Sequence, residues 1–361
     1  MPVYHAGRSD LRDVPSGNAM TSTSYSSVPS THPTPPGTLP DLRLGYHHGR
    51  LDVLLEDPRV LAVIGFGDAA PSRHPDPRYL RVALRSDAPA PFEVWRSRGA
   101  VSLGAQGPLR WAADADYEFG VIELEEAAHG GLAAAAEVAY ATLAGHFAAP
   151  CAAPFPLRIW NYLDAINLGE GDDERYRQFC SGRAAGMRLG FDRGYPAATA
   201  IGVRDGRRLL QVYWLAARQS GEAIENPRQM NAWRYPRQYG PDAPSFARAM
   251  RAPTSATQVY ISGTAAIVGH VSLHGNDFAA QMGETLANLD SVLGAAGVDE
   301  TERFGTHALL KVYVRRERDL GAARDLLAAS AAATTPVLLL RADICRSELL
   351  VEIDGVQGTS G

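Results

Sequence analysis

Short apolar runs alternate along the chain with longer segments of helical spacing, and this mixture predicts an α+β fold. Runs rich in aliphatic and aromatic residues, bounded by glycine, proline or polar residues, predict strands. We expect strands over residues 60–67, 79–84, 92–95, 157–162, 198–203, 209–215, 260–263, 309–314, 337–341 and 349–353. Apolar residues at helical spacing predict helices over 131–147, 174–187, 278–293 and 317–331.

The order of these predicted elements repeats. A strand, a long helix, a strand, a shorter helix and two further strands occur once before residue 235 and again after it, with Trp160 in the first copy aligned with Tyr313 in the second. We therefore expect two similar α+β domains, residues 39–235 and 236–361. A cleft between their related sheets would be a usual place for a small-molecule site.

The first 38 residues differ from the rest of the chain. They are dominated by Ser, Thr, Pro and Gly, and they offer few apolar groups to offset the entropy lost on ordering. We expect residues 1–38 to form a flexible tail.

Composition narrows the possible partners and the cellular location. The 361 residues are 45% hydrophobic and carry a net charge of −5, so no basic surface for nucleic acid is expected. The three cysteines, Cys151, Cys180 and Cys345, lack the CxxC spacing of zinc or disulfide motifs. There is neither an apolar run long enough to cross a bilayer nor a recognisable signal peptide, which predicts a cytoplasmic protein without a membrane partner.

Two short patterns resemble parts of a phosphate-binding loop and of a metal-binding helix, but neither motif is complete. Gly65-Phe66-Gly67 lacks the further glycines of a phosphate-binding loop, and we expect a turn there. His270 and His274 are four residues apart, but the residues between them predict strand or loop, not a metal-binding helix. We expect neither a metal nor an organic cofactor.

Glu352 is a lone carboxylate within the apolar run Leu349–Ile353. If it is buried without a cation, its pKa rises and it can hold a proton at neutral pH, as a general acid must. The alternative is that the period of two along a strand turns Glu352 towards solvent, between inward-facing Val351 and Ile353.

Several motifs resemble known families. The segment 260–293, together with the closing run Leu350–Ile353, resembles the RidA/YjgF fold, a sheet backed by two helices that is usually trimeric. In the first half, the segments 158–162, 166–167, 174–179 and 182–183 resemble the signature of the chorismatases, as does the closing Val351–Gly355. This resemblance covers residues 42–355. It implies two RidA/YjgF-like (chorismate mutase-like) α+β units, with mixed sheets backed by helices, and a monomer or a homotrimer.

The chorismatase resemblance also implies a substrate and a chemistry. Chorismate carries two carboxylates, a hydroxyl and an enolpyruvyl ether, and the family places its catalytic acid at Glu352. Arginine binds carboxylates through a planar fork, and Tyr176 and Arg183, seven residues apart on one helix, share a face. Both are therefore expected to bind substrate. Further candidate ligands are Asn161, Tyr162, Tyr213 and Arg158, although Arg158 is equally expected as a solvated surface charge.

Two residues bear on the product. Gly263 and Cys345 resemble the pattern of the branch that forms 3-hydroxybenzoate and pyruvate, whereas the hydrolytic branch yields a dihydroxy-cyclohexadiene carboxylate. Cys345 is equally compatible with the role of a small buried hydrophobe. An imine deaminase is disfavoured, because the stretch 334–339 lacks the arginine that those enzymes place there. A non-catalytic binding protein of the same fold remains the third hypothesis.

Overall fold

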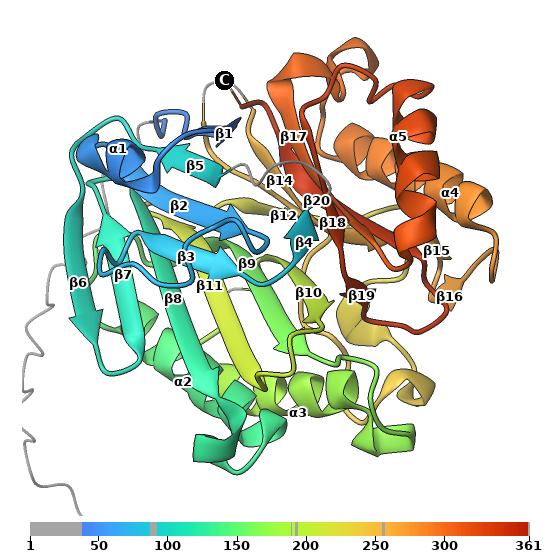
Figure 1. Cartoon of the computed structure of the whole chain (residues 1–361), viewed down its shortest axis with the longest axis horizontal. Coiled ribbons are helices and arrows are strands. Elements are labelled where there is room, and N and C mark those ends of the chain that lie inside the picture. Colours follow the sequence, from blue (N-terminus) through green and yellow to red (C-terminus); the bar gives the residue numbers. More distant parts are fainter. Residues whose placement is uncertain (1–37, 87–91, 189, 192–193, 255–256, 360–361) are drawn as a thin grey trace, which may run out of the picture. The chain divides into compact units, whose positions relative to one another are not determined.

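Three mixed sheets and five α-helices form the described part of the chain (Figure 1). The structure is a computed structural model and describes residues 38–86, 92–188, 190–191, 194–254 and 257–359. The predicted α+β class is confirmed. Of the predicted tail, all but Thr38 lies outside the described residues.

The first sheet is small and has one short helix on its outer face. Its strand order is β1 (Arg43–His47), β5 (Phe92–Arg96), β2 (Val60–Phe66) and β3 (Tyr79–Val82), and α1 spans Leu51–Glu56. Leu51 and Leu55 of α1 pack against Val63 and Val94 of the sheet, which explains why this short helix is held in place.

The second sheet has seven strands and is backed by two helices. Its order is β19 (Asp343–Ile344), β10 (Ala197–Val203), β9 (Phe155–Asp164), β11 (Leu209–Ala217), β8 (Tyr117–Glu125), β7 (Leu109–Ala113) and β6 (Ser102–Gln106). The helices are α2 (Leu132–Ala148) and α3 (Arg175–Met187). Gly182 and Gly186 let α3 approach α2 closely, because a Cβ at either position would lie within 2.5 Å of an α2 carbonyl oxygen.

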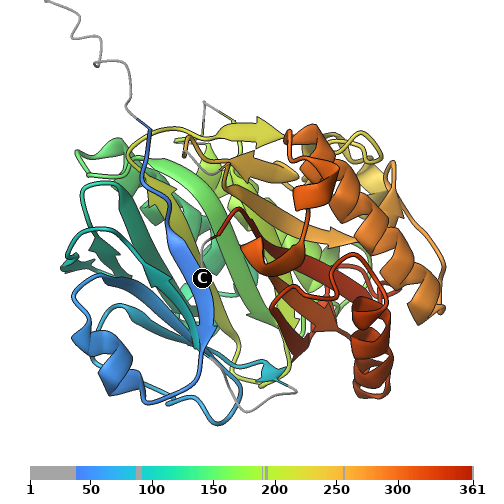
Figure 2. The ribbon, with the colours of Figure 1, turned by 90° about the horizontal axis from the view of Figure 1, so that it is seen from above.

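The third sheet also has seven strands, and its two helices lie on its outer side (Figure 2). Its order is β12 (Glu222–Ile224), β13 (Ala249–Arg251), β14 (Val259–Ala265), β20 (Val351–Gln357), β17 (Ala308–Val314), β18 (Val337–Arg341) and β4 (Arg85–Ser86). The helices are α4 (Phe278–Ala295) and α5 (Leu320–Ala328). Strands β15 (Ile267–Val268) and β16 (Val271–Ser272) pair with each other as a separate two-stranded sheet. The last predicted helix is shorter than expected, since residues 317–319 form a 3₁₀ turn.

The predicted repeat is confirmed by strand topology. The second sheet contains the order β8-β11-β9-β10 and the third contains β14-β20-β17-β18, with a parallel pair at β9–β10 and at β17–β18. The first sheet has the same arrangement, β1-β5-β2-β3 with β2 and β3 parallel, but has a loop in place of the second helix. The described residues thus form three related sheets, one more than the sequence analysis expected.

Short strands from elsewhere in the chain cover two of the repeat edges. β19 pairs with β10, and β4 pairs with β18, so that neither edge strand is left open for association with another chain. The predicted boundary at residue 235 stays a prediction.

The inner faces of the three sheets share one core, which contains a buried cluster of charges. Trp160 and Tyr213 stack there with 4.8 Å between their ring centroids, and Trp95 packs against both at a tilt. The charged members are Glu93 from the first sheet, Arg158 from the second, and Lys311 and Asp354 from the third. Their ion pairs are Lys311 Nζ–Glu93 Oε2 at 2.9 Å, Lys311 Nζ–Asp354 Oδ1 at 3.7 Å and Arg158 Nη2–Asp354 Oδ2 at 3.2 Å.

Two cations and two carboxylates make this cluster neutral overall. Burial alone would lower the pKa of Lys311, but Asp354 and Glu93 raise it to about 12. Removing one charge would leave its partners buried and unpaired, a larger penalty than the pair's net contribution. The cluster therefore ties the three sheets to each other.

We predict that Lys311→Met lowers the free energy of unfolding by about 3–5 kcal/mol, because Glu93 loses its cation in the core. Urea unfolding followed by circular dichroism measures this loss. Arg218→Gln is the matched control: it removes an exposed pair with Asp116 at 3.1 Å, and such pairs contribute about 1 kcal/mol or less. Equal losses in the two variants would contradict the proposed role of the cluster.

Candidate active site

A cavity lies where β10 of the second sheet packs against β13 and β14 of the third; we call this junction of the two sheets the seam. Ser262 and Thr199 hold the seam: Ser262 Oγ accepts from Ala198 N at 2.8 Å and donates to Ala247 O at 2.6 Å, while Gly263 N donates to Thr199 Oγ1 at 2.9 Å. Beside this seam the cavity has a volume of about 360 Å³, within the usual range for small-molecule sites.

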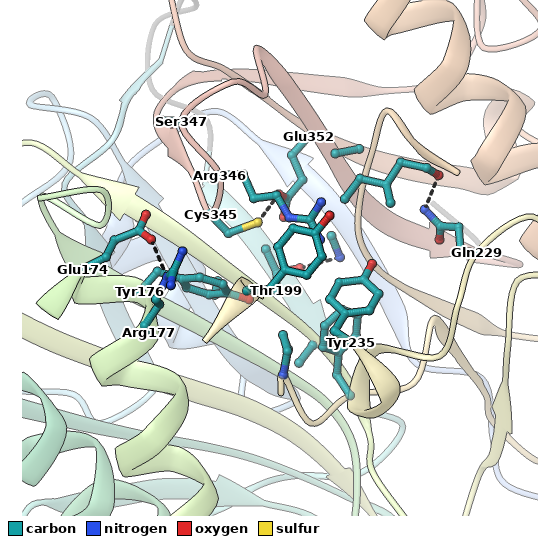
Figure 3. Close-up of a pocket in the computed structure, with 18 of the residues that line it drawn as sticks. Glu174, Tyr176, Arg177, Thr199, Gln229, Tyr235, Cys345, Arg346, Ser347 and Glu352 are labelled. Atoms are coloured by element: carbon teal, nitrogen blue, oxygen red, sulfur yellow. Dashed lines mark hydrogen bonds and ion pairs between the residues drawn. The ribbon is translucent and has the colours of Figure 1, made fainter. Parts of the chain in front are cut away.

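Glu352 faces the cavity and is 4% exposed, because β20 is buried on both of its faces. The alternative that Glu352 turns to solvent is therefore wrong. The Cys345 thiol donates to Glu352 Oε2 at 3.9 Å (Figure 3). Within the described part of the chain, no cation lies within ion-pair distance of Glu352, whereas Asp354 takes both Arg158 and Lys311.

Burial raises the pKa of Glu352 to about 8, and the neighbouring charge of Asp354 adds to the effect. At neutral pH the group is therefore mostly a protonated carboxylic acid. This is the state that a general acid needs.

Gly263 makes room for the carboxyl group of Glu352. A Cβ at position 263 would lie 2.0 Å from Glu352 Oε1 and 3.2 Å from Thr199 Cγ2. Since real Cβ atoms do not approach other atoms so closely, any side chain at position 263 would displace Glu352.

Four arginines line the same cavity, and three of them have a buried N–H group without a hydrogen-bond partner among the described residues. These groups are Arg183 Nε, Arg248 Nε and Arg346 Nη2. Other nitrogens of each guanidinium are held in place: Arg183 Nη2 donates to Ser245 O at 2.7 Å, and Arg248 Nη2 donates to Tyr235 Oη at 2.8 Å. Cations held in place in a cavity wall are suited to binding a carboxylate.

Aromatic rings form much of the remaining wall. Arg346 lies over the ring of Tyr239, 3.8 Å from its centroid, and over Tyr235 at 5.1 Å. Tyr235, labelled in Figure 3, and Tyr239 belong to the long segment between β12 and β13, and both line the cavity. Tyr176 lines the cavity from α3, and burial together with the neighbouring Cys180 raises its pKa well above the ordinary value. The wall therefore combines flat apolar surfaces with phenolic donors.

Five of the predicted site residues meet in this cavity. They are Tyr176, Arg183, Gly263, Cys345 and Glu352. They come from α3, β14, β20 and the loop before β20, so the fold brings together groups that are far apart in the sequence.

Four predicted substrate ligands do not line this cavity. Arg158 is fully buried, so it is not a solvated surface charge, and it pairs with Asp354. Asn161 accepts from Tyr140 Oη at 2.7 Å and donates to Thr199 O at 2.9 Å. Tyr162 and Tyr213 belong to the aromatic core between the sheets, where the hydroxyls of Tyr162 and Tyr313 lie 2.9 Å apart.

The sequence analysis missed several cavity residues. The most prominent are Arg248, Arg346, Thr199, Tyr235, Tyr239 and Gln229. Arg346 could have been suspected, since it follows Cys345 directly. Arg248 and the tyrosines lie in a segment without regular periodicity, so no pattern pointed to them.

Neither a metal cluster nor a bilayer-spanning helix is found in the ranges that the structure describes. His270 and His274 contact different partners: the ring of His274 contacts Glu284 at 3.1 Å, and the ring of His270 contacts Tyr239 Oη at 3.2 Å.

We predict that Glu352→Gln stabilises the fold increasingly as pH rises from about 5 to 8. The folded pKa of about 8 exceeds the ordinary 4.5, so the folded state binds more protons in this window and the wild type loses stability as pH rises. Each unit of pKa difference corresponds to about 1.4 kcal/mol. Melting temperatures at several pH values test this, with the exposed Glu348→Gln as control. A constant difference between Glu352→Gln and wild type would contradict the raised pKa.

Known proteins match the chain over most of its length. The family model described as chorismatase FkbO/Hyg5-like, N-terminal, matches residues 93–216. A 3-hydroxybenzoate synthase of Streptomyces hygroscopicus is 34% identical over 315 residues, covering 82% of this chain and 91% of that protein. A chorismatase of Streptomyces rapamycinicus is 37% identical over 282 residues, covering 73% and 81%.

A solved structure agrees with these sequence matches. The crystal structure of a chorismatase superposes with a TM-score of 0.74 at 32% identity, covering 89% of this chain and all of the other. The predicted resemblance is thus confirmed in both sequence and fold. The chain belongs to the chorismatase family.

Proposed function

We propose that the protein converts chorismate to 3-hydroxybenzoate and pyruvate. The observation that carries this proposal is a buried acid, Glu352, which faces a cavity lined by several arginines, among them Arg183, Arg248 and Arg346. Relatives named chorismatase and 3-hydroxybenzoate synthase, at 34–38% identity, support the same substrate.

The charge of the cavity fits a substrate with two carboxylates. Arg183, Arg248 and Arg346 place positive charge in the cavity wall, while Tyr176, Tyr235 and Tyr239 offer hydroxyls and flat rings for a cyclohexadiene. Burial strengthens these interactions, because water does not screen them. Among the described residues of the cavity, we find none that specifically favours imine deamination.

The reaction begins with transfer of the Glu352 proton to the methylene carbon of the enolpyruvyl ether. The ether then becomes an oxocarbenium-like centre, and its bond to the ring breaks with pyruvate as the leaving group. The ring hydroxyl displaces the side chain to give an arene oxide, and its proton restores Glu352. Opening and aromatisation of the ring give 3-hydroxybenzoate, so the atoms of chorismate are divided between two products without added water.

The resemblance of Gly263 and Cys345 to the pattern of the 3-hydroxybenzoate-forming branch supports this branch over hydrolysis, and both residues contact the acid. Gly263 lets the carboxyl group of Glu352 lie against β14, and the Cys345 thiol donates to the same carboxyl group. Both residues therefore act on the position of the acid relative to the ring. The hydrolytic branch, which yields a dihydroxy-cyclohexadiene carboxylate, is the alternative. The expected cytoplasmic location and the choice between monomer and homotrimer stay predictions.

We predict that purified wild-type protein releases one pyruvate for each chorismate consumed and that Glu352→Gln binds chorismate but loses turnover. Activity should fall as pH rises through about 8, because the carboxyl group that supplies the proton becomes ionised there. A coupled pyruvate assay and chromatography of the products measure both effects.

Three results of this assay would contradict parts of the proposal. Absence of pyruvate from the wild type would remove chorismate as the substrate. Retained turnover in Glu352→Gln would remove Glu352 as the acid. Accumulation of a non-aromatic diene would overturn the choice of branch alone.

We predict that Gly263→Ala lowers kcat by about tenfold or more, since its Cβ would displace the acid from its position. Gly283→Ala, in an open position on α4, is the matched control and should leave activity unchanged. The melting temperatures of both variants should stay close to that of the wild type. Unchanged kcat in Gly263→Ala would show that the position of Glu352 does not depend on Gly263.

A further inference from the structure

The loop between β19 and β20 carries much of the active site. It contributes Cys345 and Arg346 to the cavity and leads directly to Glu352 on β20. It is not a regular element, so its backbone needs partners from other parts of the fold. The side chain that supplies more of them than any other among the described residues is Arg315, which follows β17 and is not among the residues lining the cavity.

The guanidinium of Arg315 makes five hydrogen bonds, as many as it has N–H donors. Three go to carbonyl oxygens of the loop region: Nε to Leu349 at 2.6 Å, and Nη2 to Ile344 and Arg346, both at 2.8 Å. Nη1 donates to Asp343 Oδ1 at 2.7 Å and to Asn167 Oδ1 at 3.0 Å. Every donor of this largely buried side chain is thus used to hold residues 343–349 or Asn167.

Asn167, which follows β9 of the second sheet, binds the same loop. We call the side chains of Arg315 and Asn167 together the clamp. Its Nδ2 donates to Ile344 O at 3.0 Å and to Cys345 O at 3.2 Å, while its Oδ1 accepts from Arg315. Asn167 therefore fixes both backbone carbonyls that flank the Cys345 side chain, and Arg315 holds the first of them as well.

We propose that Arg315, with Asn167, is a positioning residue that fixes the loop carrying Cys345 and Arg346 and thereby sets the product branch. The inference rests on the proposed function, because it assigns the clamp a role in how chorismate is converted. A shift of the loop would move the Cys345 thiol away from the acid and the Arg346 cation away from the substrate anion. Misplacement by about 1 Å is enough to cost a rate on the order of 10²-fold.

Lysine cannot replace arginine in this role. An ammonium group donates from a single point, whereas the bonds of Arg315 diverge to acceptors on both sides of a planar fork. Arg204 offers a matched control, because it pairs with the same Asp343 from the exposed side but contacts none of the loop carbonyls.

The test compares Arg315→Lys, Asn167→Ala and Arg204→Gln with the wild type. Three quantities are measured: kcat and KM for chorismate, the ratio of 3-hydroxybenzoate to non-aromatic diene, and the rate at which iodoacetamide alkylates Cys345 in the ligand-free protein. We expect Arg315→Lys to lower kcat/KM on the order of 10²-fold, to increase the diene fraction and to speed alkylation. Asn167→Ala should change the same quantities in the same direction, and Arg204→Gln should leave them unchanged.

Each outcome decides the inference. A folded Arg315→Lys variant with a wild-type product ratio, kcat/KM within about twofold and an unchanged alkylation rate would overturn it. If Arg315→Lys does not fold, Asn167→Ala decides, and wild-type values in that variant would overturn the inference. A wild type that releases no pyruvate would refute the proposed function instead, while the alkylation rates would still show whether the clamp fixes Cys345.

Discussion

Glu352 and Asp354 are two carboxylates on one face of β20, and the buried cations of the core are paired with the second. Arg158 and Lys311 both contact Asp354, and Lys311 also contacts Glu93, so this cluster is neutral without any charge on Glu352. Ionising Glu352 would add a negative charge to a buried region beside Asp354, which is costly, and the neighbouring arginines offset only part of this cost. The neighbouring cluster and the burial of the site therefore keep Glu352 protonated.

The repeated sheets explain why such a site can exist. The cluster draws one residue from the first sheet, one from the second and two from the third, so that it forms only when all three sheets pack together. The same packing brings α3 and β10 beside β14 and β20, where the cavity opens. The stability of the core and the protonation of the acid thus depend on the same set of contacts.

Much of this was predictable from sequence, and the failures have physical reasons. The long helices, the buried strands and the repeat follow from apolar periodicity, and Glu352 was identified because it interrupts such a run. β8 was missed because Gly120 interrupts its pattern, and that glycine is needed where Trp214 packs against the strand. Arg158 and Tyr162 carry suitable chemistry but face the core. Arg248 and Arg346 lie in irregular segments, and only tertiary structure brings them to the cavity.

The most direct test of the account is the protonation state of Glu352 itself. Infrared difference spectra between the wild type and Glu352→Gln, recorded across pH, isolate the carbonyl stretch of a protonated carboxylic acid. The account predicts that this band is present at neutral pH in the wild type, disappears as pH rises through about 8 and is absent from the variant. A band that disappears near the ordinary glutamate pKa of 4.5 would contradict it.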